Sequence, residues 1–411
     1  MAVKMSRVDE ISCHPGLRLA RSMASMSQSG LREIMDLISR PGVLSLAIGM
    51  PAPELFPRQA LAEEAARLLA ADSSSLQYGI PWQPLKTQIV ELMAMRGVRC
   101  REEQIFLTSG SQQSIDLLAR LLLDPGGQVM MEWAVYDGAQ MAVKLREPEI
   151  LTVSTDLATG IDVDEVEGLL ARGARPAFLY VIPDGHNPLG VSVSVEKRHR
   201  LCELARRYGV PILEDDAYGF LYYGETPAPP LRAFEEEWVF YLGSFSKILA
   251  PSLRAGWMVL PEALLPRVSA LKHATDLDTP SFSHRVIAGF LESGRFPGHL
   301  AVLRNEYRRR RDAMLAALEA HFPPEVTWNR PTSGMFVWAE LPPGMDAAAL
   351  LRIAVETENV AFCPGVTLCA GDRSRGSRCM RLSFANAPER IEEAVRSLGR
   401  LIRNVLRESS A

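Results

Sequence analysis

The chain has 411 residues, of which 47% are hydrophobic and 23% are charged, as in an ordinary globular protein of two or three domains. Its 45 basic and 49 acidic side chains give a net charge of −4, so we expect no nucleic-acid partner. It has no run of about 18 apolar residues and no apolar leader at the N-terminus. We therefore expect a cytoplasmic protein with no membrane partner.

The first 50 residues are rich in Met, Ser and Gly, and we expect residues 1–55 to form an arm. This arm would pack on a small domain and on a pocket. The next amphipathic patterns predict helices over 57–71 and 85–95. Residues 56–290 are predicted to form the large domain and residues 291–411 the small one.

Within the large domain, short apolar runs alternate with amphipathic segments. The predicted strands are 105–108, 129–132, 178–182, 211–214, 239–242 and 256–260, and the predicted helices between them are 112–123, 138–144 and 195–208. This alternation predicts an α/β fold with a mostly parallel sheet covered by helices on both faces. Ligands of such sheets bind beyond the carboxyl ends of the strands.

The pattern changes in the last third of the chain. We expect a long helix, a strand, a helix, some short strands and a final helix, with the longer elements at 300–320, 335–341, 347–357 and 388–407. This order predicts a smaller α+β domain. The six cysteines are scattered and lack the spacing of metal ligands, so we predict reduced thiols and no metal site.

The most informative segment runs from Gly243 to Trp257, with the sequence GSFSKILAPSLRAGW. It places Lys247 at the end of an apolar run, beside two serine hydroxyls and seven residues before Arg254. Hydroxyls and a planar guanidinium suit a phosphate, and an amine suits a Schiff base. A single lysine at a strand end is more often simply solvated, but this context favours a functional group.

Three further strand ends carry polar residues. In VIPDGHNPLG (181–190) Asn187 precedes a proline, and ILEDDAY (212–218) places Asp215 at the end of the next strand. Asp215 could pair with a protonated ring nitrogen or could cap a helix. In LTSGSQQ (107–113) the strand passes through Gly110 into a helix, whose free N–H groups would bind an anion.

Together and in this order, these segments resemble the fold-type I pyridoxal-phosphate enzymes, and most closely the class I and II aminotransferases that act on 2-aminoadipate and kynurenine. The resemblance extends to GMPAPELFP (49–57), QYG (77–79), SGMFVW (333–338) and MRLSF (380–384). It implies an aspartate-aminotransferase-like fold, pyridoxal 5'-phosphate as cofactor, and transamination between an L-amino acid and a 2-oxo acid.

The resemblance also implies roles for single residues. Lys247 would form the Schiff base and move the proton, Asp215 would pair with the ring nitrogen, and Tyr136 would stack on the ring. Asn187 and Tyr218 would bind the ring oxygen. The phosphate would be bound by Gly110, Ser111, Gln112, Ser244, Ser246 and Arg254.

The resemblance also implies a carboxylate-binding arginine, a residue shared between subunits and a substrate pocket. Arg381 would bind the substrate carboxylate, and Tyr78 would reach the phosphate in the neighbouring subunit of a homodimer with shared active sites. The substrate pocket would further include Asn187, Gly49, Ile48 and His186.

The chain departs from the family pattern around the pocket. His186 and Leu189 stand where the family usually has Gln and Thr, and Ile48 replaces a usual glycine. The His186 ring could serve as an acid or a base, or could be packed and neutral. An arginine that relatives of acidic specificity carry aligns roughly with Ser25. These differences keep open an alternative reaction on the same scaffold: β- or γ-elimination, replacement or C–C bond formation.

A non-enzymatic alternative is a ligand sensor, because some relatives fuse this domain to a DNA-binding module. About 50 residues precede the Gly49 motif, too few for such a module with its linker, so we expect an enzyme instead.

Overall fold

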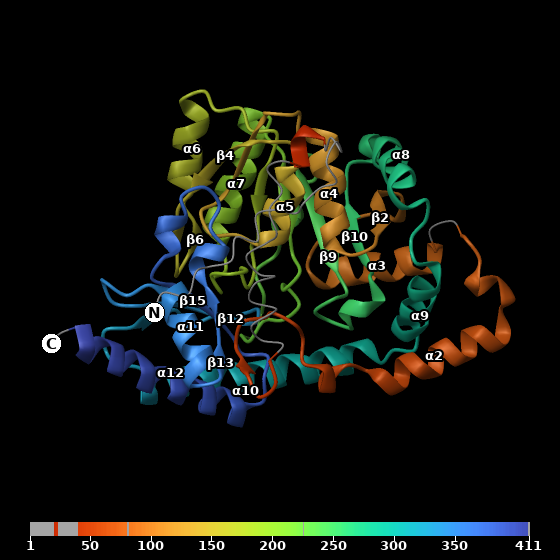
Figure 1. Cartoon of the computed structure of the whole chain (residues 1–411). Helices are drawn as coiled ribbons and strands as arrows, with labels where there is room; N and C mark the ends of the chain where they lie inside the picture. The colour runs from red at the N-terminus through yellow and green to blue at the C-terminus, as the bar shows by residue number, and fades with distance from the viewer. Residues whose placement is uncertain (1–19, 24–39, 80–81, 225, 410–411) are drawn as a thin grey trace, which may run out of the picture.

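The computed structural model of the chain describes residues 20–23, 40–79, 82–224 and 226–409. Its largest sheet has seven strands in the order β2-β10-β9-β8-β7-β3-β4 (Figure 1). In chain order these are β2 (Ile105–Thr108), β3 (Gln128–Glu132), β4 (Glu149–Val153), β7 (Leu179–Val181), β8 (Ile212–Asp215), β9 (Val239–Ser244) and β10 (Gly256–Val259). Neighbouring strands from β9 to β4 pair in parallel, whereas β10 is antiparallel to both β9 and β2.

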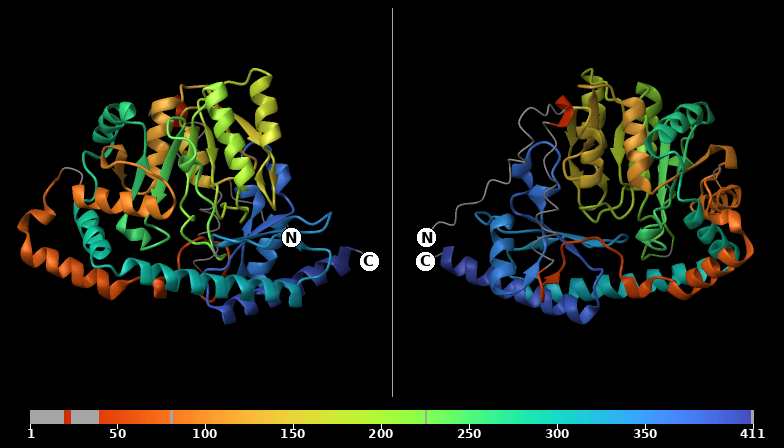
Figure 2. Two further views of the ribbon diagram at one scale, coloured as in Figure 1. Left: turned by 180° about the vertical axis from the view of Figure 1, so that it is seen from behind. Right: turned by 45° about the vertical axis from the view of Figure 1, so that its right-hand side comes forward.

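Helices cover both faces of this sheet (Figures 1 and 2). The covering helices include α3 (Gln83–Met95), α4 (Ser111–Leu122), α5 (Asp137–Lys144), α6 (Val163–Ala171), α7 (Val195–Tyr208) and α8 (Leu265–Asp276). Successive residues of β10 divide between the two faces. The Trp257 Nε1 donates to the sulfur of Met93 on α3 at 3.3 Å, whereas Met258 belongs to the hydrophobic cluster that contains Ile115 of α4. The predicted α/β fold is confirmed.

Local signals explain where the helices begin and end. The Ser194 hydroxyl accepts a hydrogen bond from the Lys197 amide at 3.3 Å and so caps α7. Gly209 ends the same helix in the left-handed region at φ +65°. Such helices connect strands that run in the same direction, so the carboxyl ends of these strands lie at one edge of the sheet.

The C-terminal part contains an antiparallel sheet in the order β11-β12-β15-β14. Its strands are β11 (Thr327–Trp328), β12 (Phe336–Glu340), β14 (Cys363–Pro364) and β15 (Cys379–Ser383), and its helices are α11 (Ala347–Thr357) and α12 (Pro388–Ser409). The long helix α10 (Phe296–His321) packs against α12 (Figure 1). Near the N-terminus, β1 (Leu44–Ser45) pairs in parallel with β13 (Val360–Ala361), which ties residues 44–45 to this C-terminal part. We retain the division at residues 55 and 290 as a proposal.

Several elements were not predicted from the sequence. They are β4, the hairpin of β5 (Thr155–Asp156) and β6 (Gly160–Ile161), the helices α6 and α8, and α9 (Ser281–Glu292), which packs on α2 (Arg58–Ala71). The predicted arm lies largely outside the described residues, and so does Ser25. In the described part of the chain, no helix is long and apolar enough to cross a membrane.

Candidate active site

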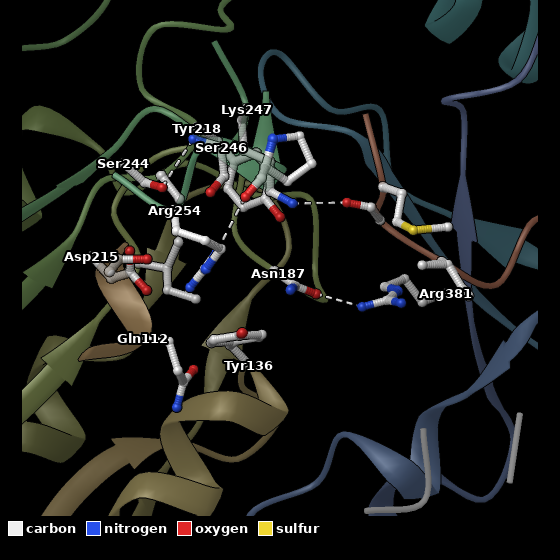
Figure 3. Close-up of a pocket in the computed structure, with 17 residues that line it drawn as sticks. Gln112, Tyr136, Asn187, Asp215, Tyr218, Ser244, Ser246, Lys247, Arg254 and Arg381 are labelled. Carbon is white, nitrogen blue, oxygen red and sulfur yellow. Dashed lines mark hydrogen bonds between the residues drawn. The ribbon is translucent and has the colours of Figure 1, made fainter. Parts of the chain in front are cut away.

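A cavity of about 320 Å³ lies at the carboxyl ends of β7, β8 and β9 (Figure 3). It is lined by most of the residues that the sequence analysis selected: Ile48, Gly49, Ser111, Gln112, Tyr136, Asn187, Asp215, Tyr218, Ser244, Ser246, Lys247, Arg254 and Arg381. Met50, Ile182, Ala217 and Pro251 complete the wall. The fold therefore gathers segments that lie far apart in the sequence.

Lys247 follows β9, and its Nζ donates a hydrogen bond to the carbonyl oxygen of Gly49 at 2.9 Å. Burial lowers the pKa of this amine to about 8, and the charges of Arg381 and Arg254 act in the same direction. Asp215 opposes them by favouring the ammonium form. A lysine with such a pKa is partly neutral near neutral pH, as a nucleophilic amine requires.

The lowered pKa predicts how Lys247 reacts with an acylating reagent in the cofactor-free protein. Only the neutral amine reacts, so the rate of acetylation rises with pH and levels off above about pH 8. Competitive labelling followed by peptide mass spectrometry measures this rate. A profile that keeps rising toward the ordinary lysine pKa of 10.5 would contradict the environment described for Lys247.

Groups that can bind an anion gather at the N-terminus of α4. Gly110 precedes this helix with φ +91°, a conformation that favours glycine. A Cβ atom at Gly110 would lie 2.9 Å from Nη2 of Arg254, whose guanidinium donates to the Ser109 carbonyl oxygen at 2.7 Å. The free N–H groups of a helix N-terminus, a guanidinium and the hydroxyls of Ser244 and Ser246 are groups that bind phosphate.

Asp215 ends β8, and only 3% of its surface is exposed. Its Oδ2 accepts a hydrogen bond from the Tyr180 hydroxyl at 2.6 Å, whereas its Oδ1 has no hydrogen-bond partner among the described residues. Burial raises the pKa of this carboxyl to about 6. A buried carboxylate oxygen without a partner at a cavity wall fits the protonated ring nitrogen of pyridoxal phosphate, and the neighbouring anion site fits its phosphate.

Arg381 projects from β15 at the other end of the cavity. Its Nη1 donates to Oδ1 of Asn187 at 2.6 Å (Figure 3). Its Nη2 donates to the carbonyl oxygen of Ala47, also at 2.6 Å. Its guanidinium also lies 4.4 Å from the centroid of the Phe336 ring. These contacts hold a planar, buried cation in one orientation, as recognition of a carboxylate requires.

Three predicted site residues do not line the cavity. Gly110 lies just behind it at the start of α4, and Tyr78 is 76% exposed on the surface. His186 is buried, with its Nε2 2.8 Å from Oε2 of Glu132 and its Nδ1 accepting from the Leu189 amide at 3.3 Å. The prediction that His186 contacts substrate is therefore not supported, because the ring contacts Glu132 at the end of β3 and does not line the cavity.

Two aromatic residues next to the site were given no role by the sequence analysis. Tyr180 binds Asp215, and Phe336 lies between Arg381 and Gly49, where a Cβ at Gly49 would come within 2.3 Å of its ring. A tyrosine inside an apolar parallel strand was the available signal, because its buried hydroxyl must find a partner. Phe336 belongs to the SGMFVW segment (333–338) that carries the family resemblance, but nothing in that segment indicated that its ring would lie beside Arg381.

A family model described as aminotransferase class I and II matches residues 41–398. The 2-aminoadipate transaminase of Thermus thermophilus is 42% identical over 92% of this chain and 94% of its own length. Aromatic-amino-acid aminotransferase 1 of Thermococcus litoralis is 37% identical over 93% of both chains.

Among solved structures, the alpha-aminoadipate aminotransferase of Thermus thermophilus, complexed with N-(5'-phosphopyridoxyl)-L-leucine, superposes with a TM-score of 0.87. It is 38% identical, and the match covers 95% of this chain and 98% of the other. These relatives do not favour the alternative of elimination, replacement or C–C bond formation. The chain therefore belongs to the class I and II aminotransferase family and is a pyridoxal-phosphate-dependent aminotransferase.

Proposed function

We propose that the cavity around Lys247 is the active site, and that it transfers an amino group from an L-amino acid to a 2-oxo acid. The observation that carries this proposal is the arrangement of three groups around one cavity. They are the Lys247 amine with its lowered pKa, the buried guanidinium of Arg381, and the Oδ1 of Asp215, which has no hydrogen-bond partner in the part of the chain that the structure describes. An anion site lies beside them at Arg254.

Pyridoxal phosphate supplies an electron sink that stabilises negative charge on the substrate Cα. In our proposal Asp215 holds its ring nitrogen, Tyr136 contacts its ring face, and Asn187 and Tyr218 bind its ring oxygen. The phosphate is held by Gly110, Ser111, Gln112, Ser244, Ser246 and Arg254. Burial raises the pKa of both tyrosines, to about 12 for Tyr136, so their hydroxyls stay protonated and able to donate.

Lys247 would hold the cofactor as its Schiff-base lysine, and its amine, once released by substrate, would move the proton from the substrate Cα to C4′ of pyridoxal phosphate. Its lowered pKa suits a general base that works near neutral pH. Arg381 binds the substrate carboxylate and thereby orients the Cα–H bond toward this amine. Asn187 holds the Arg381 guanidinium in place through its side-chain oxygen.

The wall near Arg381 includes the apolar side chains of Ile48 and Met50. We propose that the side chain of the amino donor packs against them and is uncharged. Incubation with ¹⁵N-labelled amino acids and a 2-oxo acid tests the function, because transamination moves the label to the new amino acid. Leucine and phenylalanine are expected to donate faster than 2-aminoadipate, and absence of label transfer from every donor would refute transamination.

Arg254 gives a test of the phosphate site. Replacing it with Met removes a charge-assisted hydrogen-bond donor, which is worth about 1.5–3 kcal/mol. We expect the affinity for pyridoxal phosphate to fall about 10- to 100-fold in a fluorescence titration of the cofactor-free protein. Pyridoxal, which lacks the phosphate, is the control ligand. An equal loss of affinity for both ligands would show that Arg254 does not bind the phosphate.

We also propose a homodimer with shared active sites. Three large apolar side chains are exposed near each other, Leu76, Tyr78 and Leu277, at 72%, 76% and 55%. Their segments are joined by a hydrogen bond from the Gly79 amide to Oδ2 of Asp278 at 2.8 Å. Exposed apolar side chains of this size favour a protein–protein contact. In the proposed dimer Tyr78 reaches the phosphate bound by the partner chain.

Mixing two impaired variants tests this sharing of sites. Tyr78→Ala is expected to weaken cofactor binding about tenfold, and Lys247→Ala to be inactive. If Tyr78 acts across the dimer, a heterodimer of the two variants contains one intact site, so mixing restores activity at limiting cofactor. If mixing restores nothing although heterodimers form, Tyr78 acts within its own chain or not at all.

The described cysteines Cys100, Cys202, Cys363, Cys369 and Cys379 are all free thiols. Free thiols are typical of a reducing compartment, and we propose that the protein works in the cytoplasm.

A further inference from the structure

The contact between Tyr180 and Asp215 follows from the strand register. Tyr180 on β7 is paired with Leu213 on β8, and Asp215 lies two residues farther along the same strand. Residues two apart share a face of the sheet, so the tyrosine reaches diagonally to the carboxylate. The Tyr180 hydroxyl donates to Oδ2 at 2.6 Å, and the side chain is 1% exposed.

This contact makes the two oxygens of the carboxylate different. Oδ2 is bound to a buried phenol, whereas Oδ1 has no hydrogen-bond partner among the described residues, and Asp215 lines the cavity. A phenylalanine at position 180 would fill nearly the same volume without donating. The hydroxyl therefore acts on Asp215 itself, beyond packing.

We propose that Tyr180 is a positioning residue that keeps Asp215 weakly basic. The proton between Asp215 and the ring nitrogen of pyridoxal phosphate then stays on the nitrogen. This inference rests on the proposed role of Asp215. A donor hydrogen bond stabilises a carboxylate in its charged form. A ring nitrogen that keeps its proton is the better electron sink.

The groups around Asp215 shift the pKa of its carboxyl in opposite directions. Burial raises the pKa of this carboxyl, and the neighbouring carboxylate of Asp216 raises it further. The Tyr180 hydroxyl, the backbone amide of Ala217 and the Lys247 ammonium lower it. Because Lys247 changes its charge and position when it reacts, Tyr180 is the side chain that can stabilise the carboxylate without interruption.

The chain contains a matched control on the opposite face of β8. Tyr241 on β9 is paired with Glu214, and its hydroxyl donates to Oδ2 of Asp216 at 2.8 Å. This is the same diagonal contact between a buried tyrosine and a buried aspartate. Asp216 is also held by Nη2 of Arg96 at 3.2 Å, and it does not line the cavity.

The test compares Tyr180→Phe with Tyr241→Phe in the holoenzyme, loaded with pyridoxal phosphate that carries ¹⁵N in the ring. The ¹⁵N chemical shift reports whether this nitrogen is protonated. In Tyr180→Phe we expect the equilibrium for moving the proton to Asp215 to rise about tenfold, with the resonance displaced toward unprotonated pyridine. Tyr241→Phe should keep the wild-type shift. Equal shifts in wild type and both variants would overturn the proposal.

Two further samples keep the result decisive. Replacing Tyr180 with 3,5-difluorotyrosine retains the shape and strengthens the donor, so the resonance should move in the opposite direction, and a displacement toward unprotonated pyridine would count against the proposal. Asp215→Asn distinguishes a failure of the role of Tyr180 from a failure of the proposed role of Asp215. If it displaces the resonance while both Tyr180 variants do not, only this inference fails. If it leaves the resonance unchanged, Asp215 does not contact the ring nitrogen, and both fail.

Discussion

Replacing Lys247 with Ala is expected to reduce transamination by at least about 10⁴-fold, the largest effect of any single substitution in this chain. The substitution removes both the amine that forms the Schiff base and the base that moves the Cα proton, and such proton transfers contribute about 10²- to 10⁴-fold on their own. The absorption band of the Schiff base should disappear with it. Added methylamine, which carries a free amine, should restore a small part of the rate.

Lys197→Ala is the matched control for this experiment. The Lys197 amine also donates to a backbone carbonyl oxygen, that of Gly160 at 2.9 Å, but it does not line the cavity. We expect Lys197→Ala to keep both the band and the activity. A Lys247→Ala enzyme with more than about a hundredth of the wild-type rate would exclude Lys247 as the catalytic amine.

Replacing Arg381 with Leu is expected to lower kcat/KM for amino acids about 10²- to 10³-fold. A buried charge that loses its partner typically costs about 2–5 kcal/mol, and Arg381 is 3% exposed. Arg381→Lys should be impaired as well, because an ammonium cannot reproduce the planar fork of a guanidinium. Steady-state kinetics with a series of amino acids measures both losses.

A primary amine without a carboxylate provides the control for Arg381. Its slow reaction with the enzyme should change less than about tenfold in Arg381→Leu, because the missing guanidinium has no partner on that substrate. A loss as large as that seen with amino acids would mean that the substitution disturbs Asn187 or the backbone at Ala47 instead of substrate binding.

Strand ends were the part of the site that the sequence could predict. Lys247, Asp215 and Asn187 each follow an apolar run, and parallel strands bring such ends to one edge of a sheet. Arg381 comes from a separate antiparallel sheet, and only its motif indicated its role. Local sequence does not specify which distant strand an arginine will face.

The orientation of the His186 ring is a second feature that could not be predicted from the sequence. Its partner Glu132 comes much earlier in the chain, at the end of β3, and the other ring nitrogen accepts a hydrogen bond from the Leu189 amide. Both the catalytic and the packed interpretation fitted the sequence. The structure supports the packed one, because the ring is buried against Glu132 and does not line the cavity.

The sequence contained a signal for the antiparallel direction of β10 that was not used. Its apolar residues resemble those of a parallel strand, since both kinds are buried on two faces. The connection from β9 contains only the short helix η6 (Pro251–Leu253) and no α-helix. A parallel neighbour needs a crossover of a dozen or more residues, usually a helix, so this short connection already favoured an antiparallel strand.

A single-turnover absorption experiment on the holoenzyme tests the central claim most directly. Addition of a reactive amino acid alone should convert the Schiff-base band to that of pyridoxamine phosphate and release one equivalent of 2-oxo acid per active site. Subsequent addition of a 2-oxo acid should restore the original band. Release of ammonia from the amino acid while the cofactor remains in its pyridoxal form would contradict transamination and indicate elimination.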